Sequence, residues 1–127
     1  MSTITDAESW IGNTLTDSDG RKLGTIDDVY ADEPSGQPLW MVIRSGRFHP
    51  KFSFVPLADA VLDGDVIVTG YGRAQVENAP KFEPADALPD SLVRAMYAHY
   101  GLRYDAPVAP PAVPIRDVVA RTLRYVN

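Results

Sequence analysis

The stretch Leu39-Trp40-Met41-Val42-Ile43 places five apolar residues in succession. Side chains in a strand alternate between the two faces of a sheet, so a strand without a polar face has to be covered on both sides. Turn-forming sequence flanks the stretch, with a glycine and two prolines in residues 33–38 and a glycine and a proline in residues 45–50. We therefore expect this stretch to be the central strand of the fold.

Further short strands are expected on either side of it. The chain contains runs with β-branched and aromatic residues between turn signals, without helices between them. These runs are residues 11–17, 22–32, 52–55 and 66–71. Short strands at such spacing are typical of a small antiparallel barrel or sandwich. The sequence thus predicts a mainly β unit over residues 9–80, after an N-terminal extension of residues 1–8.

The run Asp17-Ser18-Asp19-Gly20-Arg21 resembles both the start of a calcium-binding loop and the turn of a β-hairpin. A helix–loop–helix calcium site needs oxygen ligands at loop positions 1, 3 and 5 and a glutamate at position 12. Position 5 is Arg21, a cation that cannot bind a cation, and position 12 is Asp28. We therefore interpret the run as a hairpin turn in which Gly20 has a positive φ, and we expect no metal site.

The chain is acidic, and its charge is unevenly distributed. Its 127 residues include 12 Lys and Arg against 17 Asp and Glu, a net charge of −5. Residues 1–100 hold 8 and 15 of these, whereas residues 101–127 hold 4 and 2. Because an acidic body repels phosphate backbones, direct nucleic-acid binding is not expected. The absence of cysteine, of a secretory signal and of an apolar run of ~18 residues leads us to expect a cytoplasmic protein.

Several short motifs follow one another over residues 9–102. They are Ile11-Gly12, Asp17-x-Asp19-Gly20-x-x-Leu23-Gly24, Ile26-Asp27-Asp28-Val29-Tyr30, Gly36-x-Pro38-x-Trp40, Phe54-Val55-Pro56-Leu57, Gly64-Asp65, Tyr71, Val76-x-x-Ala79-Pro80, Leu92, Met96 and Tyr97-x-x-Tyr100-Gly101. In this order they resemble the PRC-barrel domain of stand-alone bacterial proteins, of the photosynthetic reaction centre H subunit and of the ribosome maturation factor RimM. The resemblance implies a six-stranded antiparallel barrel that serves as an assembly or docking module and has no shared set of catalytic residues.

Residues 81–102 are expected to form a loop and a helix that covers the barrel. A helix over residues 90–100 can begin at Asp90 or Ser91, which are good N-cap residues, and end at Gly101 in the left-handed conformation. One face of this helix is apolar. We expect this face to close one mouth of the barrel or to cover its side, and it comprises Leu88, Leu92, Met96 and Tyr100.

The last 25 residues differ from the rest of the chain. Residues 103–114 contain four prolines and are expected to be a semi-rigid linker, and residues 115–127 are expected to form an amphipathic helix. A helix of about twelve residues is marginal alone in water, so it has to pack against something. Three destinations are open: its own barrel, a second subunit or another protein, and, weakly, a membrane surface. The predicted partner-binding residues are Ile115, Val118, Val119, Thr122, Leu123 and Val126.

The densest acidic run contains Asp27, Asp28, Asp32 and Glu33. Asp27 and Asp28 point to opposite faces of a strand and cannot easily share one ion, so a solvated acidic edge is favoured over a divalent metal site. The two histidines lack a zinc-binding spacing, and the chain has no nucleophile elbow. The sequence therefore predicts no catalytic, cofactor-binding or metal-binding residues.

Together these features indicate a non-catalytic protein-interaction module. It would dock through the barrel surface or the C-terminal helix, on another protein or as a homodimer. The alternatives are an RNA-processing or ribosome-associated accessory factor, by fold analogy with RimM, and a small-ligand-binding protein. An enzyme is not expected.

Overall fold

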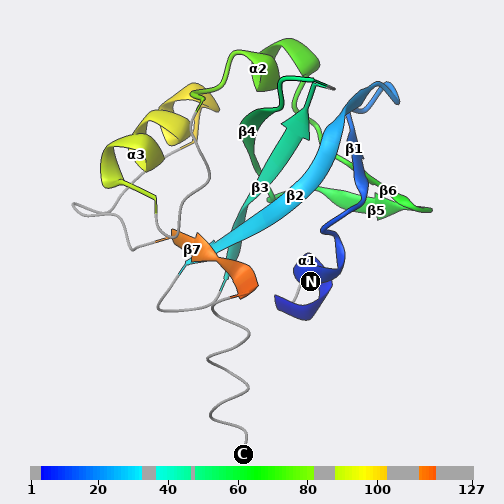
Figure 1. Ribbon diagram of the computed structural model, residues 1–127, viewed down its shortest axis with the longest axis horizontal. Coiled ribbons are helices and arrows are strands. Elements are labelled where there is room, and N and C mark those ends of the chain that lie inside the picture. Colours follow the sequence, from blue (N-terminus) through cyan, green and yellow to red (C-terminus); the bar gives the residue numbers. More distant parts are fainter. Residues whose placement is uncertain (1–3, 33–36, 47, 82–87, 103–111, 117–127) are drawn as a thin grey trace, which may run out of the picture.

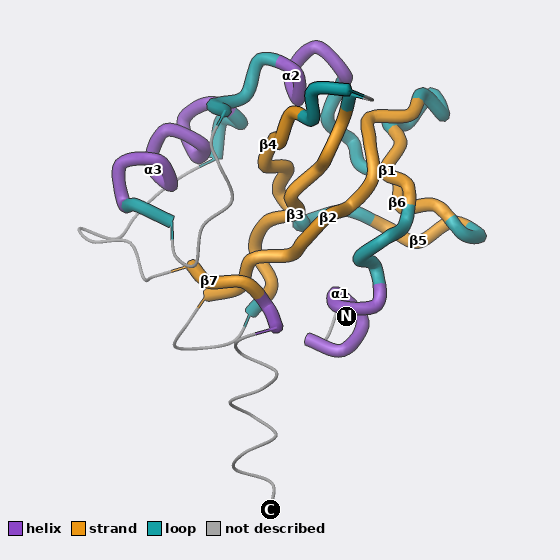
Figure 2. Tube along the Cα trace, in the orientation of Figure 1, coloured by secondary structure: helices purple, strands orange, loops and turns teal. Residues whose placement is uncertain are grey.

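The protein is described here from a computed structural model, which covers residues 4–32, 37–46, 48–81, 88–102 and 112–116. A mixed sheet forms its centre, and helices pack around it (Figures 1 and 2). The elements are α1 (Ile4–Ser9), β1 (Thr14–Thr16), β2 (Lys22–Asp32), β3 (Pro38–Ser45), β4 (Lys51–Pro56), β5 (Val61–Asp63), β6 (Val66–Val68), α2 (Arg73–Glu77), α3 (Asp90–His99) and β7 (Ala112–Pro114).

The sheet corrects the expected six-stranded antiparallel barrel. The strand order is β4-β3-β2-β1-β6-β5, and β7 pairs with β2 as a seventh strand. β6, the second strand of the β5–β6 hairpin, lies next to β1 and runs parallel to it, with Thr14 opposite Val66. Among the described residues, β4 and β5 lie at the two ends of this order and do not pair, so these strands form an open sheet.

The eleven-residue strand β2 is the longest strand of this sheet. Residues 25–31 pair with β3 along one edge, whereas the opposite edge pairs with β1 near Lys22–Thr25 and with β7 at Tyr30–Asp32. The register with β3 shifts between Ile26 and Asp28, which makes Asp27 the extra residue of a β-bulge. Gly24 is required where β2 crosses β3, because a Cβ atom there would lie 2.4 Å from Ile43 Cγ2 and 2.6 Å from the Arg44 carbonyl oxygen.

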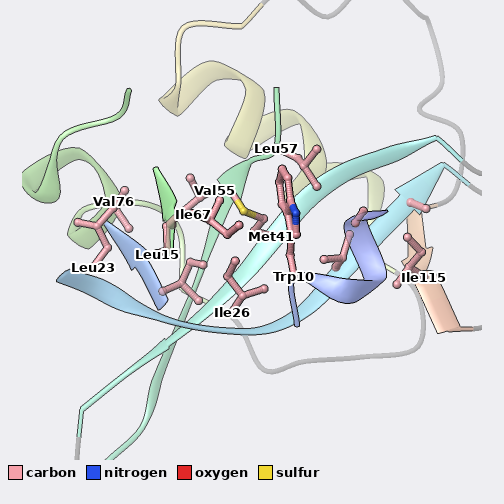
Figure 3. Packing of buried hydrophobic residues seen from close by; sticks show 14 of the residues in the cluster. Trp10, Leu15, Leu23, Ile26, Met41, Val55, Leu57, Ile67, Val76 and Ile115 are labelled. Carbon is pink, nitrogen blue, oxygen red and sulfur yellow. The ribbon is translucent and has the colours of Figure 1, made fainter. Parts of the chain in front are cut away.

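The central strand is covered on both faces, as predicted. Trp40 and Val42 belong to a cluster rich in aromatic residues on one face, whereas Met41 and Ile43 belong to a mainly aliphatic cluster on the other. Figure 3 shows the aliphatic cluster, in which side chains from β1 to β4 meet Trp10 and Ile115. The fully buried members of the two clusters include Leu15, Ile26, Val29, Met41, Ile43, Ile67 and Ile115, and Tyr30, Trp40, Val42, Phe54 and Met96.

Helix α3 covers the aromatic face of the sheet. It spans Asp90–His99, and Gly101 follows with φ +68°, which agrees with the predicted end of the helix. The expected cap is wrong: Pro89 occupies the N-cap position without a side-chain hydrogen bond, and Asp90 instead pairs with Arg94 at 2.7 Å. The Tyr100 hydroxyl donates to the Phe54 carbonyl oxygen, which fixes the end of α3 to β4.

The run at Asp17 is a hairpin turn, as predicted. It connects β1 to β2, and Gly20 has φ +85°. The Asp17 carboxylate accepts hydrogen bonds of 2.9 Å from the backbone amides of Asp19 and Arg21, so its oxygen closes the turn. This local bonding accounts for the aspartate without a bound cation.

Candidate docking surfaces

The segment that leads into the C-terminal tail is part of the fold. β7 pairs antiparallel with Tyr30–Asp32, and Ile115 directly after it is 0% exposed within the aliphatic cluster. We call residues 112–116 the tail root. The sequence predicts a proline-rich linker over residues 103–114, of which residues 112–114 form β7 and residues 103–111 lie outside the described residues. Pro114 is tolerated in this strand because β7 lies at a sheet edge, where a missing N–H leaves no strand unpaired.

The predicted partner-binding residues divide at the tail root. Ile115 is enclosed by its own chain, in the same cluster as Trp10 (Figure 3), so it is not available to a partner. The other five residues lie outside the described residues, and they are Val118, Val119, Thr122, Leu123 and Val126. Their pattern remains a prediction from sequence.

An ion pair also connects the tail root to β2. Arg116 Nη1 lies 2.8 Å from Asp28 Oδ2, and the Asp28 side chain is 13% exposed. The Val29 amide donates to the other Asp28 oxygen at 2.8 Å. Burial raises the pKa of Asp28, while the bond from Val29 and the charge of Arg116 act in the opposite direction. The carboxylate is thus partly desolvated where it pairs with Arg116 of the tail root.

Asp27 and Asp28 have separate cationic partners. Asp27 lies 3.4 Å from Arg44 of β3, and both side chains are exposed. Of the remaining acidic run, Asp32 ends β2 beside β7, and Glu33 lies outside the described residues. Within the described residues, no group of three acidic or histidine side chains is placed to hold a metal ion.

The opposite end of β2 borders a feature that sequence reasoning missed. Two hollows of about 410 and 390 Å³ adjoin there, and they share Leu23, Ser45, Gly46 and Arg73. Apolar side chains of Leu23, Ile43 and Val76 contribute to the lining. We call the combined feature the cationic cleft, because its lining includes Lys22, Arg44, Lys51, Arg73 and Lys81.

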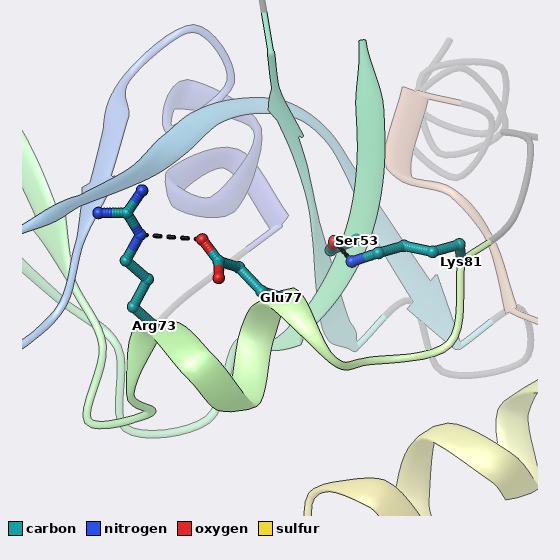
Figure 4. A network of polar contacts seen from close by, with 4 residues as sticks. All are labelled: Ser53, Arg73, Glu77 and Lys81. Atoms are coloured by element: carbon teal, nitrogen blue, oxygen red, sulfur yellow. Dashed lines mark hydrogen bonds and ion pairs between the residues drawn. The ribbon is translucent and has the colours of Figure 1, made fainter. Parts of the chain in front are cut away.

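Only part of this positive charge is neutralised within the fold. Arg44 pairs with Asp27, and Arg73 pairs with Glu77 at 2.9 Å (Figure 4). Lys22 and Lys51 form neither an ion pair nor a side-chain hydrogen bond with a described residue. Lys81 donates to the Ser53 hydroxyl at 2.7 Å, a neutral partner. Burial and then the charge of Lys51 lower the pKa of Lys81, while the charge of Glu77 acts in the opposite direction.

A family comparison identifies the fold. A family model of the PRC-barrel domain matches residues 4–76, which is more than half of the chain. The chain belongs to the PRC-barrel domain family. No curated protein matches it. The matched residues include Lys22, Arg44, Lys51 and Arg73 of the cationic cleft, whereas Lys81, α3 and the tail root lie beyond the PRC-barrel match.

The Ser53–Lys81 contact raises the question of whether this PRC-barrel protein has a nucleophile. A serine–lysine pair is reactive when the lysine is neutral and shielded from water, so that it can accept the serine proton. Here Lys81 is exposed and donates, while Ser53 is buried within β4. The two residues also form a β-bridge. The contact therefore attaches the chain after α2 to the sheet and presents Lys81 as a cation.

The two histidines of the PRC-barrel protein have different surroundings. His99 Nε2 donates to the Gln75 carbonyl oxygen at 2.6 Å and thus connects α3 to α2. His49 is exposed in the turn between β3 and β4. In the part of the chain that the structure describes, no helix has the length and apolar character needed to cross a membrane.

Proposed function

We propose that this PRC-barrel protein is a non-catalytic docking module whose C-terminal helix, residues 115–127, binds another protein or a second copy of the chain. The observation that carries the proposal is the tail root. Strand pairing, the buried Ile115 and the Asp28–Arg116 pair fix the start of the predicted helix at one place on the sheet. A predicted apolar face then follows immediately, beginning at Val118.

The energetics favour reversible docking. Burying the four aliphatic residues of the predicted face beyond the tail root would stabilise a complex by ~6–12 kcal/mol before ordering costs. They are Val118, Val119, Leu123 and Val126. Ordering about ten residues costs roughly 10–20 kcal/mol, at about 1–2 kcal/mol per residue for the backbone, which cancels this gain unless the helix is already partly ordered, so the docking is weak and reversible. Because the tail root is already fixed, the ordering cost falls only on the residues after it.

The test uses two variants with the same change in net charge. Val119→Asp/Leu123→Asp places two negative charges on the predicted apolar face, whereas Arg121→Gln/Arg124→Gln removes two positive charges from the polar face. We expect the first to lose self-association in light scattering, or partner capture from a native lysate, and the second to retain it. Circular dichroism should show an intact fold for both.

Three results would contradict the proposal. The first is association that is unchanged by Val119→Asp/Leu123→Asp. The second is an equal loss of association in both variants, which would indicate a net-charge effect. The third is unfolding of Val119→Asp/Leu123→Asp, which would place the helix within the core of its own chain.

A further inference from the structure

The cationic cleft concentrates positive charge on an acidic protein. Of the 12 Lys and Arg residues, eight lie in the described part of the chain, and five of those line the cleft. Two of the five have carboxylate partners, Asp27 and Glu77. The cleft therefore keeps an excess of three positive charges, on Lys22, Lys51 and Lys81. Like charges without a carboxylate partner repel one another, so a bound anion would relieve this repulsion.

The shape of the cleft favours an extended ligand. Its two hollows adjoin, sharing Leu23, Ser45, Gly46 and Arg73, so one ligand chain can occupy both. Lys22 lines one hollow and Lys51 and Lys81 line the other, so the uncompensated cations lie toward both ends. A single phosphate ion would reach only one of these groups, whereas an extended chain would reach both.

An exposed aromatic residue adjoins the cleft. Phe48 is 82% exposed and belongs to the turn between Gly46 and Lys51, both of which line the cleft. Large aromatic side chains are enriched among the residues that dominate protein–protein binding energy. Phe48 does not line the cleft itself, but its exposure in this turn makes it the aromatic side chain that we assign to an apolar contact with the ligand.

We propose that the cationic cleft binds an extended acidic segment of a partner protein, with carboxylates on Lys22, Lys51 and Lys81 and an apolar side chain against Phe48. The inference rests on the proposed role as a docking module but concerns a surface distinct from the C-terminal helix.

Charge favours a peptide over a nucleic acid as the ligand. Non-specific nucleic-acid binding depends on many phosphate contacts, each of which needs a cation. Three uncompensated cations on a chain with net charge −5 provide few such contacts and leave the rest of the phosphate backbone in a repulsive field. A short peptide with three or four carboxylates matches the available charge.

The test measures binding of a fluorescent ten-residue peptide, rich in glutamate with a central leucine, by anisotropy at 50 mM salt. We expect saturable binding that weakens as salt rises. Lys22→Gln/Lys51→Gln should weaken it roughly tenfold, since each exposed charge pair contributes a few tenths to about 1 kcal/mol. The matched control, Arg121→Gln/Arg124→Gln, loses the same charge elsewhere and should bind as the wild type does. Phe48→Ala should weaken binding of this peptide but not of one with glycine at the centre.

Several outcomes would overturn the inference. One is the absence of peptide binding, and another is binding that Lys22→Gln/Lys51→Gln leaves unchanged. Stronger binding of an oligothymidine of equal length would assign the cleft to nucleic acid, and full displacement by equimolar inorganic phosphate would assign it to a small anion. Val119→Asp/Leu123→Asp separates the two proposals: it should retain peptide binding while losing association. If this variant also loses peptide binding, the peptide binds the C-terminal helix and not the cleft. The inference about the cleft then fails, while the proposed function of the helix stands.

Discussion

The two ends of β2 use charge in opposite ways. At the carboxyl end, β7 pairs with the strand, Ile115 is buried and Arg116 is matched with Asp28. At the amino end, cations outnumber carboxylates and line an open cleft. The charges at the carboxyl end are paired within the fold, whereas several cations at the amino end have no carboxylate partner among the described residues. This difference separates a surface that holds the protein together from one that is available to a ligand.

The change between the two ends occurs at adjacent residues. The β-bulge at Asp27 lets this side chain pair with Arg44, which lines the cleft, while Asp28 faces Arg116 of the tail root. Two neighbouring aspartates thus serve the two ends separately. The predictions below test this division, from the largest expected effect to the smallest.

Removal of Trp40 should have the largest effect, because its ring is enclosed in the cluster beneath α3, which also holds Tyr30 near the carboxyl end of β2. It is 1% exposed and packs against Phe54, Tyr97 and Tyr100. Trp40→Ala should lower the free energy of unfolding by ~3–5 kcal/mol in urea titrations followed by circular dichroism. Phe48→Ala, at an exposed site, is the control and should change it by less than about 0.5 kcal/mol. Near-wild-type stability of Trp40→Ala would contradict the packing.

Removal of the Ile115 side chain tests whether the tail root belongs to the fold. Because this side chain is fully buried, Ile115→Ala should cost ~2–5 kcal/mol of the free energy of unfolding. Val119→Ala, on the predicted docking face, should cost far less in the isolated protein. Equal, small effects in urea titrations would mean that the tail root is only loosely attached, and the contrast between the two ends of β2 would be lost.

The central strand and the hairpin turn could be predicted because their signals are local. An uninterrupted apolar run requires cover on both faces, and Gly20 after two aspartates is a strong turn signal. The end of α3 at Gly101 was predictable for the same reason. Its N-cap was not, because Pro89 and Asp90 are both acceptable at a helix start and the choice depends on the path of the preceding chain.

The two ends of β2 were much harder to predict. β7 is three residues long and rich in proline and alanine, so it resembles a linker until its pairing with β2, more than 80 positions earlier, is known. The cleft collects single cations from β2, β3, β4, α2 and the segment after α2. No sequence window shows such an accumulation, and the overall negative charge hides it.

The Asp28–Arg116 pair, at the carboxyl end of β2, predicts a dependence of stability on pH. Burial raises the pKa of Asp28 above its ordinary 3.8, so its neutral form is favoured in the folded state. Its contribution to stability is present below 3.8 and is lost as the pH rises through the raised pKa. Asp28→Asn stays neutral and can still accept from Val29. Its free energy of unfolding, from urea titrations, should match that of the wild type near pH 3 and exceed it slightly, by about 1 kcal/mol or less, near pH 7.

The opposite sign would change the interpretation of this end. If Asp28→Asn became less stable than the wild type as the pH rises, the attraction of Arg116 would outweigh the burial of Asp28. The pair would then be a source of stability in its own right.

The smallest effect on stability is expected at the cleft. Lys22 and Lys51 are exposed and make no side-chain hydrogen bond within the described residues. Lys22→Gln/Lys51→Gln should therefore leave the free energy of unfolding unchanged or raise it slightly, by up to about 0.5 kcal/mol, because like-charge repulsion is relieved. A loss of more than 1 kcal/mol would show that these cations are structural, and the distinction between the two ends would fail.

The most direct test of this division is a titration of the ¹⁵N-labelled protein with the acidic ten-residue peptide, followed by amide chemical shifts. We predict progressive shifts at residues 22–25, 44–46, 51–53 and 73–81, which line the cleft, and none at Tyr30–Asp32 or Ile115. Shifts centred on Tyr30–Asp32 and Ile115, or no shifts at residues 22–25, would contradict the assignment of one end of β2 to a ligand and the other to the fold.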